Sequence, residues 1–439
     1  MKQRETLDIN EKGHLRIGGC DCVELAKQYG TPLYVMDEAY IRGICRGYTE
    51  LLSQKYPDST VAYASKAFSA LAVYGIVREE GLGADFVSGC ELYTALKAGM
   101  PADKIYFHGN NKSPEELTYA VREGVHAVVV DSLYEIELLN EIACKQGKAQ
   151  NVLVRVNPGI DAHTHRFIQT TRPDSKFGFS VADGTAREVI CSITKKSNLV
   201  FLGVHCHIGS QIFELKPFAL AVEKMTDFIA RLAQEGIAVR ELNMGGGYGV
   251  TYTEEDKPLA PREYVDAIVT KLQECIASKK IAAPRLIIEP GRSIVGEAGI
   301  TLYTVGAIKE IKDLKKYIAV DGGMFENPRY ALYQSKYDAL LANRANEQPV
   351  ETVTVAGKCC ESGDMLIEEI RLPRAKSGDI LAVFTTGAYN YSMASNYNRN
   401  AVPPVVLVCN GNSEYIVKPQ TYEDIVSRDV LPARLGESK

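Results

Sequence analysis

Eight short apolar runs, separated by stretches with helical spacing, narrow the possible folds of this chain more than any other feature. The runs are often β-branched, and they lie at 61–64, 84–87, 105–107, 127–130, 152–156, 201–204, 241–244 and 286–288. Strands that alternate with helices pair in parallel through right-handed crossovers. Eight such units predict a closed (β/α)8 barrel. The alternative, an open doubly wound sheet, needs fewer units and a phosphate loop after its first strand.

The stretches between the runs carry two kinds of helix signal. One is an apolar face with three- and four-residue spacing, for example Phe218, Ala221, Val222, Met225, Phe228, Ile229 and Leu232. The other is a start signal. Ser113-Pro114-Glu115-Glu116 predicts a complete capping box, and Ser132 with Glu135 predicts a second one.

The pattern changes after Arg292, where long helices become scarce. Short strand-like runs separated by Gly, Asp and Asn turns lie at 301–311, 317–320, 352–356, 380–384, 405–409 and 415–417. Near the N-terminus, strands are predicted at 15–17 and 33–36, with a helix at 23–29 between them. We therefore expect a barrel domain over 37–292. Residues 1–36 and 293–439 are expected to form a mostly β, Greek-key-like second domain.

Length and charge limit the class of protein. A chain of 439 residues exceeds the usual size of one core, which agrees with two domains. A net charge of -5 argues against nucleic acid or an anionic membrane as the main partner. We find no signal peptide and no apolar run of membrane-spanning length. The 11 scattered cysteines do not suggest a disulfide framework, and neither Cys20-Asp21-Cys22 nor Cys359-Cys360 has a second ligand pair for a metal. The expected location is the cytoplasm.

Lys66 ends the first apolar run, Val61-Ala62-Tyr63-Ala64-Ser65. An unpaired buried ammonium is costly, so a lysine at this position needs an explanation. A strand end that reaches water is the common one. The other is an amine held in a dry pocket, where a lowered pKa allows Schiff-base chemistry.

Functional side chains of a barrel lie just beyond the C-terminal ends of its strands. These ends supply Lys66, Asp85, His108, Asn110, Asp131, Arg155, Asn157, His205, His207, Ser210, Gly245-Gly246-Gly247 and Glu289-Pro290-Gly291-Arg292. Taken singly, a glycine triplet is more often a tight turn, and a strand-end histidine is as often a core residue. Together they place an amine, an imidazole, a glycine turn, a carboxylate and a guanidinium on one rim.

Pyridoxal phosphate requires this combination. Its aldehyde needs a lysine, and its phosphate needs backbone N–H groups helped by a serine or an arginine. Its ring nitrogen needs an acid that keeps it protonated. Gly245–Gly247 can approach a phosphate closely because glycine has no Cβ, and Glu289 can serve as the acid.

Several motifs in order along nearly the whole chain resemble the fold-type III pyridoxal phosphate-dependent decarboxylases. They are Tyr63-Ala-Ser-Lys66-Ala, Gly203-Val-His-Cys-His207-Ile-Gly-Ser210-Gln, Gly245-Gly-Gly247, Glu289-Pro-Gly-Arg292, Asp321-Gly-Gly-Met, Cys360-Glu361-Ser-Gly-Asp364 and Gly387-Ala-Tyr389. One departure is Tyr330, since the family more often has proline after the arginine at position 329.

The resemblance implies a role for each matching residue. Lys66 would form the Schiff base, His207 would stack on the cofactor ring, and Glu289 would pair with the ring nitrogen. Further cofactor contacts would come from Asp85, Ser210, Gly246, Gly247, Gly291, Arg292 and Tyr389. Substrate contacts would come from Arg292, Arg329, Tyr333, Glu361 and Tyr389. Cys360 would be the proton donor, entering with Glu361 from the partner subunit of a homodimer.

Within the family, the motifs are most similar to those of members that convert meso-2,6-diaminopimelate into L-lysine and CO2. Arg292 or Arg329 would bind the distal carboxylate, and Glu361 the distal ammonium. Ornithine, arginine and carboxynorspermidine decarboxylases are the alternatives, but their substrates leave Arg329 and Tyr333 unexplained. An alanine racemase is disfavoured by Glu289, and a non-catalytic relative by the presence of both Lys66 and Cys360.

Overall fold

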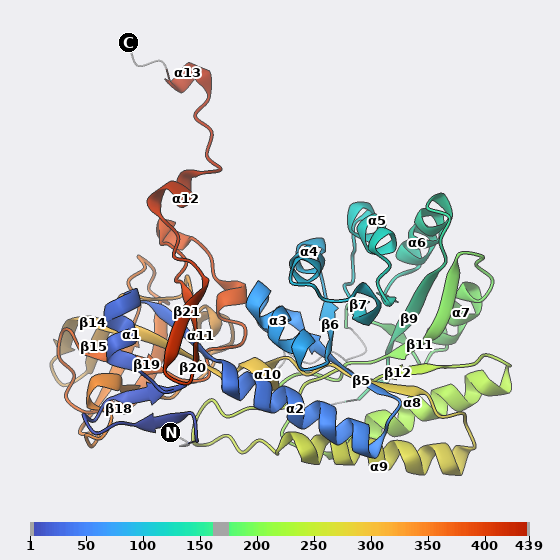
Figure 1. Ribbon diagram of the computed structural model, residues 1–439, viewed down its shortest axis with the longest axis horizontal. Coiled ribbons are helices and arrows are strands. Elements are labelled where there is room, and N and C mark those ends of the chain that lie inside the picture. Colours follow the sequence, from blue (N-terminus) through green and yellow to red (C-terminus); the bar gives the residue numbers. More distant parts are fainter. Residues whose placement is uncertain (1–3, 161–174, 437–439) are drawn as a thin grey trace. The chain divides into compact units, whose positions relative to one another are not determined.

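The computed structural model describes residues 4–160 and 175–436. The chain divides into two compact units (Figure 1). One is Tyr40–Glu297, and the other combines Met1–Ala39 with Ala298–Lys439.

The first unit is a closed barrel of eight parallel strands. In chain order they are β5 (Ser59–Ala64), β6 (Gly83–Phe86), β7 (Ile105–Phe107), β8 (Ala127–Val130), β9 (Gln150–Asn157), β11 (Leu199–His205), β12 (Glu241–Asn243) and β13 (Arg285–Ile288). Each pairs with the next, and β13 pairs back onto β5. A two-residue strand, β10 (Phe179–Ser180), pairs in parallel with the C-terminal end of β9. All eight strands predicted from the sequence are confirmed, and the open-sheet alternative is wrong.

Helices connect the strands on the outside of the barrel (Figure 1). They are α2 (Glu38–Lys55), α3 (Leu71–Glu79), α4 (Gly89–Lys97), α5 (Pro114–Glu123), α6 (Leu133–Lys145), α7 (Thr185–Ile193), α8 (Lys216–Gln234) and α9 (Pro261–Lys279), with short turns η1 (Ser65–Ala67), η2 (Ala102–Lys104) and α10 (Arg292–Val295). The predicted apolar face of α8 is buried from Phe218 to Leu232. This burial supplies the main stability of such a helix.

Of the two predicted capping boxes, only the one at Ser113 is complete. There the Ser113 hydroxyl accepts from the Glu116 N–H, and the Glu116 carboxylate accepts from the Ser113 N–H. At α6 the Ser132 hydroxyl caps the helix, but the Glu135 carboxylate accepts from the Asp131 N–H and from Nζ of Lys112. The second complete box was therefore wrong. The Glu135 carboxylate binds the buried ammonium of Lys112 instead.

The second unit is built on a mixed sheet. Its strands are β4 (Leu33–Asp37), β14 (Gly299–Ile311), β15 (Lys315–Val320), β16 (Ala339–Leu341), β17 (Glu351–Ala356), β18 (Met365–Leu372), β19 (Ile380–Val383), β20 (Val405–Cys409) and β21 (Asn412–Val417). β4 lies inside the sheet, antiparallel to β14 and parallel to β20. The expectation that N-terminal strands join this β domain is confirmed.

Smaller elements complete this unit. They are a three-stranded sheet of β1 (Leu7–Ile9), β2 (Leu15–Ile17) and β3 (Cys20–Asp21), and the helices α1 (Cys22–Tyr29), α11 (Arg329–Tyr333), α12 (Tyr422–Val426) and α13 (Ala433–Gly436). Across the residues described in both units, none of the helices has the length and apolarity to cross a membrane.

Candidate active site

The C-terminal ends of the barrel strands collect most of the predicted site residues. Lys66 lies in η1, directly after β5, and Asp85 lies within β6. His108 follows β7, His205 ends β11 with His207 just beyond, and Glu289 follows β13. The charge of Lys66 acts on both Asp85 and His207, so these three side chains share one neighbourhood.

Lys66 itself is exposed, whereas its neighbours Ser65 and Ala67 are buried. The structure therefore does not place this amine in a dry pocket. An exposed amine at a barrel mouth remains reachable by a carbonyl compound.

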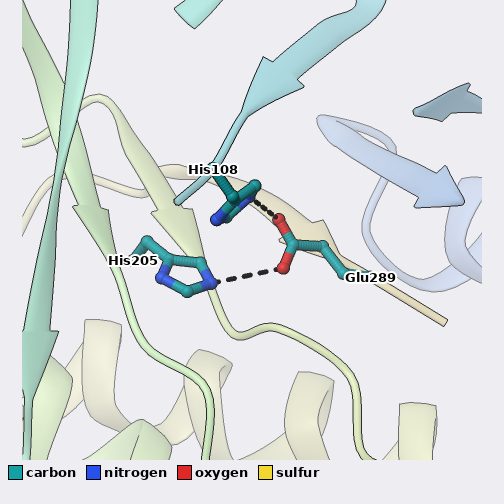
Figure 2. Close-up of side chains that lie close together, drawn as sticks. All are labelled: His108, His205 and Glu289. Carbon is teal, nitrogen blue, oxygen red and sulfur yellow. Dashed lines mark hydrogen bonds and ion pairs between the residues drawn. The ribbon is translucent and has the colours of Figure 1, made fainter. Parts of the chain in front are cut away.

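Glu289 is the centre of the site (Figure 2). Its Oε1 lies 2.8 Å from Nε2 of His108 and 2.6 Å from Nδ2 of Asn243, and its Oε2 lies 3.2 Å from Nε2 of His205. Glu289 and both histidines are almost fully buried. Such a buried carboxylate is stable only when donors surround it, and here three different strand ends supply them.

The protonation states in this cluster follow from burial and pairing. Burial alone raises the pKa of the Glu289 carboxyl, but His108 and His205 outweigh this effect and hold its pKa well below the usual range. Burial lowers the pKa of His205 to about 3, so this imidazole is neutral near pH 7. Burial also raises the pKa of Asp85 to about 6. The site thus holds an ionised Glu289 beside a His205 imidazole that is neutral near pH 7.

The glycine turn Gly245-Gly246-Gly247 has no room for side chains. A Cβ on Gly246 would lie 2.1 Å from the Glu289 carbonyl oxygen, and one on Gly247 would lie 2.4 Å from the Gly209 carbonyl oxygen. Gly245 and Gly247 also have positive φ angles of 66° and 106°. These contacts bring backbone to the barrel mouth at a distance that only glycine allows.

Two further groups lie beside this turn. The Gly246 N–H donates to Nδ1 of His207 at 3.3 Å, so Nδ1 is the acceptor nitrogen of that ring. Arg292, the first residue of α10, donates to the Ser210 hydroxyl at 2.9 Å and to the Tyr252 hydroxyl. Burial lowers the pKa of His207 well below its usual value, and the charge of Lys66 adds to this effect.

The remaining predicted residues belong to the second unit. Arg329 is buried in α11 and donates to the Tyr337 hydroxyl at 3.1 Å, while Tyr333 ends the same helix. Cys360 and Glu361 are exposed in the turn between β17 and β18. Tyr389 has a positive φ of 63°.

The turn that carries Cys360 is held from several sides. The Asp364 carboxylate accepts from the N–H groups of Met324 and Cys359, both at 2.6 Å. The Cys360 N–H donates to Oδ1 of Asn398 at 2.8 Å. The backbone of this turn is thereby fixed while the thiol and the Glu361 carboxylate face outward.

Sequence reasoning missed the partners of Glu289. His108 and His205 stood among the strand-end residues without a role, and Asn243 was not singled out at all. A signal for Asn243 was present, because an amide side chain within the apolar run 241–244 must find hydrogen bonds when it is buried.

These residues fit pyridoxal phosphate. A glycine turn with no space for Cβ atoms, next to an arginine and a serine, suits a phosphate. A buried, ionised carboxylate suits a protonated ring nitrogen.

The comparisons with known proteins agree with this donor set. Residues 44–296 match the family model described as the pyridoxal binding domain of pyridoxal-dependent decarboxylases. Fold and site together thus define a pyridoxal-dependent decarboxylase barrel.

Relatives narrow the class further. The chain is 50% identical to the diaminopimelate decarboxylase of Bacillus subtilis, with 97% of each chain covered, and 44% identical to that of Staphylococcus aureus, with 97% of this chain and 99% of the relative covered. It superposes with a TM-score of 0.92 on the diaminopimelate decarboxylase of M. jannaschii in complex with L-lysine, at 36% identity over 98% of this chain and 99% of the other. The chain belongs to the diaminopimelate decarboxylase family.

Proposed function

We propose that the protein removes one carboxylate of meso-2,6-diaminopimelate, releasing CO2 and L-lysine, with pyridoxal phosphate bound at the mouth of its barrel. The observation that supports this chemistry is the buried, ionised Glu289 carboxylate, which accepts hydrogen bonds from His108, His205 and Asn243. The relatives' names and two lysine-bound structures, from M. jannaschii and Helicobacter pylori, support the substrate and the product.

Bound pyridoxal phosphate supplies an aldehyde for the substrate amine and an electron-accepting ring for the decarboxylation. The chain's own residues prepare that chemistry. Lys66 would hold the aldehyde through its exposed amine. His207 would lie against the ring, and Glu289 would keep the ring nitrogen protonated. Further cofactor contacts are proposed for Asp85, Ser210, Gly246, Gly247, Gly291, Arg292 and Tyr389.

The substrate has two similar amino-acid ends, so its distal end must be recognised. Arg292 or Arg329 binds the distal carboxylate, and Glu361 binds the distal ammonium. Tyr333 and Tyr389 complete the substrate contacts. A substrate without the distal carboxylate leaves the arginine unpaired, which is costly.

Cys360 gives its proton to the substrate's Cα after CO2 has left. We propose that Cys360 and Glu361 reach the barrel of a partner subunit in a homodimer. The exposure of both side chains on a turn with a fixed backbone supports this arrangement. We further propose that 37–292 is the cofactor-binding domain, that 1–36 with 293–439 is the domain that delivers Cys360, and that the protein works in the cytoplasm.

Incubation with meso-, LL- and DD-diaminopimelate, ornithine and arginine tests the proposed function. We expect CO2 and L-lysine from the meso isomer, and little turnover of ornithine or arginine. Preferred turnover of ornithine or arginine would instead establish the related basic amino-acid decarboxylase activity.

A further inference from the structure

We propose that His205, together with His108 and Asn243, is a positioning residue that keeps the Glu289 carboxylate ionised and in one orientation for the cofactor's ring nitrogen. This inference rests on the role given to Glu289 in the proposed function. The three residues form what we call the Glu289 cage.

The direction of the hydrogen bonds follows from chemistry. An ionised carboxylate only accepts, so Nε2 of His108 and Nε2 of His205 must each carry a proton. The pKa of His205 lies at about 3, so its neutral form prevails near pH 7 and its Nδ1 carries no proton. His205 is therefore a neutral donor. It can stabilise the charge of Glu289 by a hydrogen bond without transferring a proton to the carboxylate.

The orientation of Asn243 is equally determined. Its Oδ1 accepts from the Gly245 N–H at 2.9 Å, so its Nδ2 is the atom that faces Glu289. The Glu289 N–H in turn donates to the Gly245 carbonyl oxygen at 2.8 Å. The glycine turn and the carboxylate are thus held in one geometry by a ring of three hydrogen bonds.

The two ring nitrogens of His205 have different surroundings. Nδ1 is buried and has no hydrogen-bond partner among the residues that the structure describes. An unsatisfied buried acceptor costs free energy. The hydrogen bond from Nε2 to the buried carboxylate of Glu289 offsets this cost, so the donor nitrogen explains a histidine at this position.

A second histidine–glutamate pair in the barrel serves as a control for the contacts of His108 and His205 with Glu289. His126, just before β8, places its Nε2 2.8 Å from Oε1 of Glu241, the first residue of β12. This pair has the same chemistry and spacing as His108 with Glu289. It lies at the N-terminal ends of the strands, away from the proposed cofactor site.

The test compares the affinity of the cofactor-free protein for pyridoxal phosphate with its affinity for the analogue that has carbon in place of the ring nitrogen. The two ligands differ only at the ring nitrogen, so the ratio of the two affinities isolates the contact of that atom with Glu289. We expect His205→Leu to lower this ratio about tenfold or more. His205→Gln, which retains an N–H donor, should recover most of it, and His126→Leu should leave it unchanged.

Glu289→Gln separates this inference from the proposed function. If Glu289→Gln leaves the ratio unchanged, the role given to Glu289 is wrong. If Glu289→Gln lowers the ratio and His205→Leu does not, only the cage is refuted. In the double variant, His205→Leu should add nothing to Glu289→Gln, because a residue that acts through another has no effect once that other is gone.

A second measurement applies even if His205→Leu fails to fold. Nitrogen-15 NMR of the wild-type protein at pH 7 should show His205 neutral, with its proton on Nε2. A protonated imidazolium, or a proton on Nδ1, would refute the cage.

Discussion

Nδ2 of Asn243 lies 2.6 Å from Oε1 of Glu289, so the last residue of β12 holds the acid that follows β13. Parallel strands bring their C-terminal ends to one edge, which allows neighbouring ends to bond in this way. Together with Nε2 of His108 and Nε2 of His205, Asn243 thus holds both oxygens of this buried carboxylate.

Removing the charge of Glu289 tests whether this carboxylate supports the electron-accepting ring of the cofactor. Glu289→Gln retains an oxygen acceptor for the cage, so the fold and the cofactor site should persist. We expect kcat to fall on the order of 10²-fold or more, the size typical of a lost electrostatic group, with a smaller change in KM. Steady-state kinetics on meso-diaminopimelate provide the measurement. An unchanged kcat would mean that the ring nitrogen is paired elsewhere.

Lys66 is the proposed site of cofactor attachment. The purified protein should be yellow, and borohydride should fix the cofactor to Lys66, as read by mass spectrometry of its peptides. Lys66→Ala should lose this attachment and nearly all turnover. Lys104→Ala, in η2, is the control and should retain both. Wild-type protein that stays colourless after addition of pyridoxal phosphate would contradict the assignment.

The proposed sharing of active sites between subunits predicts complementation. A homodimer has two equivalent sites, so a mixture of Lys66→Ala and Cys360→Ala chains should form heterodimers with one intact site. After random exchange we expect about a quarter of wild-type activity. Each parent alone should be nearly inactive. If heterodimers form and no activity returns, the sites are not shared.

Lys112 and Glu135 form a buried ion pair, with Nζ and Oε1 2.6 Å apart and side chains only 1% and 2% exposed. Nζ also donates to the carbonyl oxygens of Gly109 and Val129. Lys112→Met leaves the Glu135 charge buried without its partner, which should cost about 3–5 kcal/mol of unfolding free energy. Urea unfolding gives the measurement. Lys271→Met removes one partner of an exposed pair and should cost less than about 1 kcal/mol.

Glu326 predicts a pH dependence of stability. Burial raises its pKa from 4.5 to about 8, and its Oε1 accepts from the Tyr303 hydroxyl at 2.6 Å. Between these values the folded chain holds a proton that the unfolded chain has released. The free energy of unfolding should therefore fall as the pH rises, by up to about 1.4 kcal/mol per pH unit.

Glu326→Gln has no carboxyl to titrate and should flatten this dependence, leaving the variant more stable than the wild type at pH 8. Thermal unfolding from pH 5 to pH 8 measures the effect. Glu141→Gln, on the exposed face of α6, should retain the wild-type slope.

The barrel could be predicted because its signals are local. β7 and β8 have the bounds expected from the sequence, since each apolar run ends at a polar residue. β18 was missed because Glu368, Glu369 and Arg371 interrupt its apolar residues, and such an alternating strand resembles a polar loop. In the structure, the carboxylate of Glu368 accepts from the Tyr330 hydroxyl and forms an ion pair with Lys315.

The site was predictable as a set of strand ends, but its internal bonds were not. His108 and His205 lie 181 and 84 residues from Glu289 in the chain, and the closing of the barrel brings all three together. Which donor reaches which oxygen depends on strand register and side-chain rotamer. No local pattern encodes either. For the same reason, the sequence did not predict that Glu135 would pair with Lys112 and leave the capping box of α6 incomplete.

The position of β4 inside its sheet sets the order in which the protein can be completed during synthesis. Leu33–Asp37 leaves the ribosome before either of its neighbours in the sheet, because β14 and β20 follow the entire barrel in the chain. At roughly 5–20 residues per second, β4 waits tens of seconds for β20. Until β14 and then β20 emerge, one or both of its backbone edges lack a native neighbour, so a nascent chain of this protein should depend on protection of residues 33–37 until β20 has been synthesised.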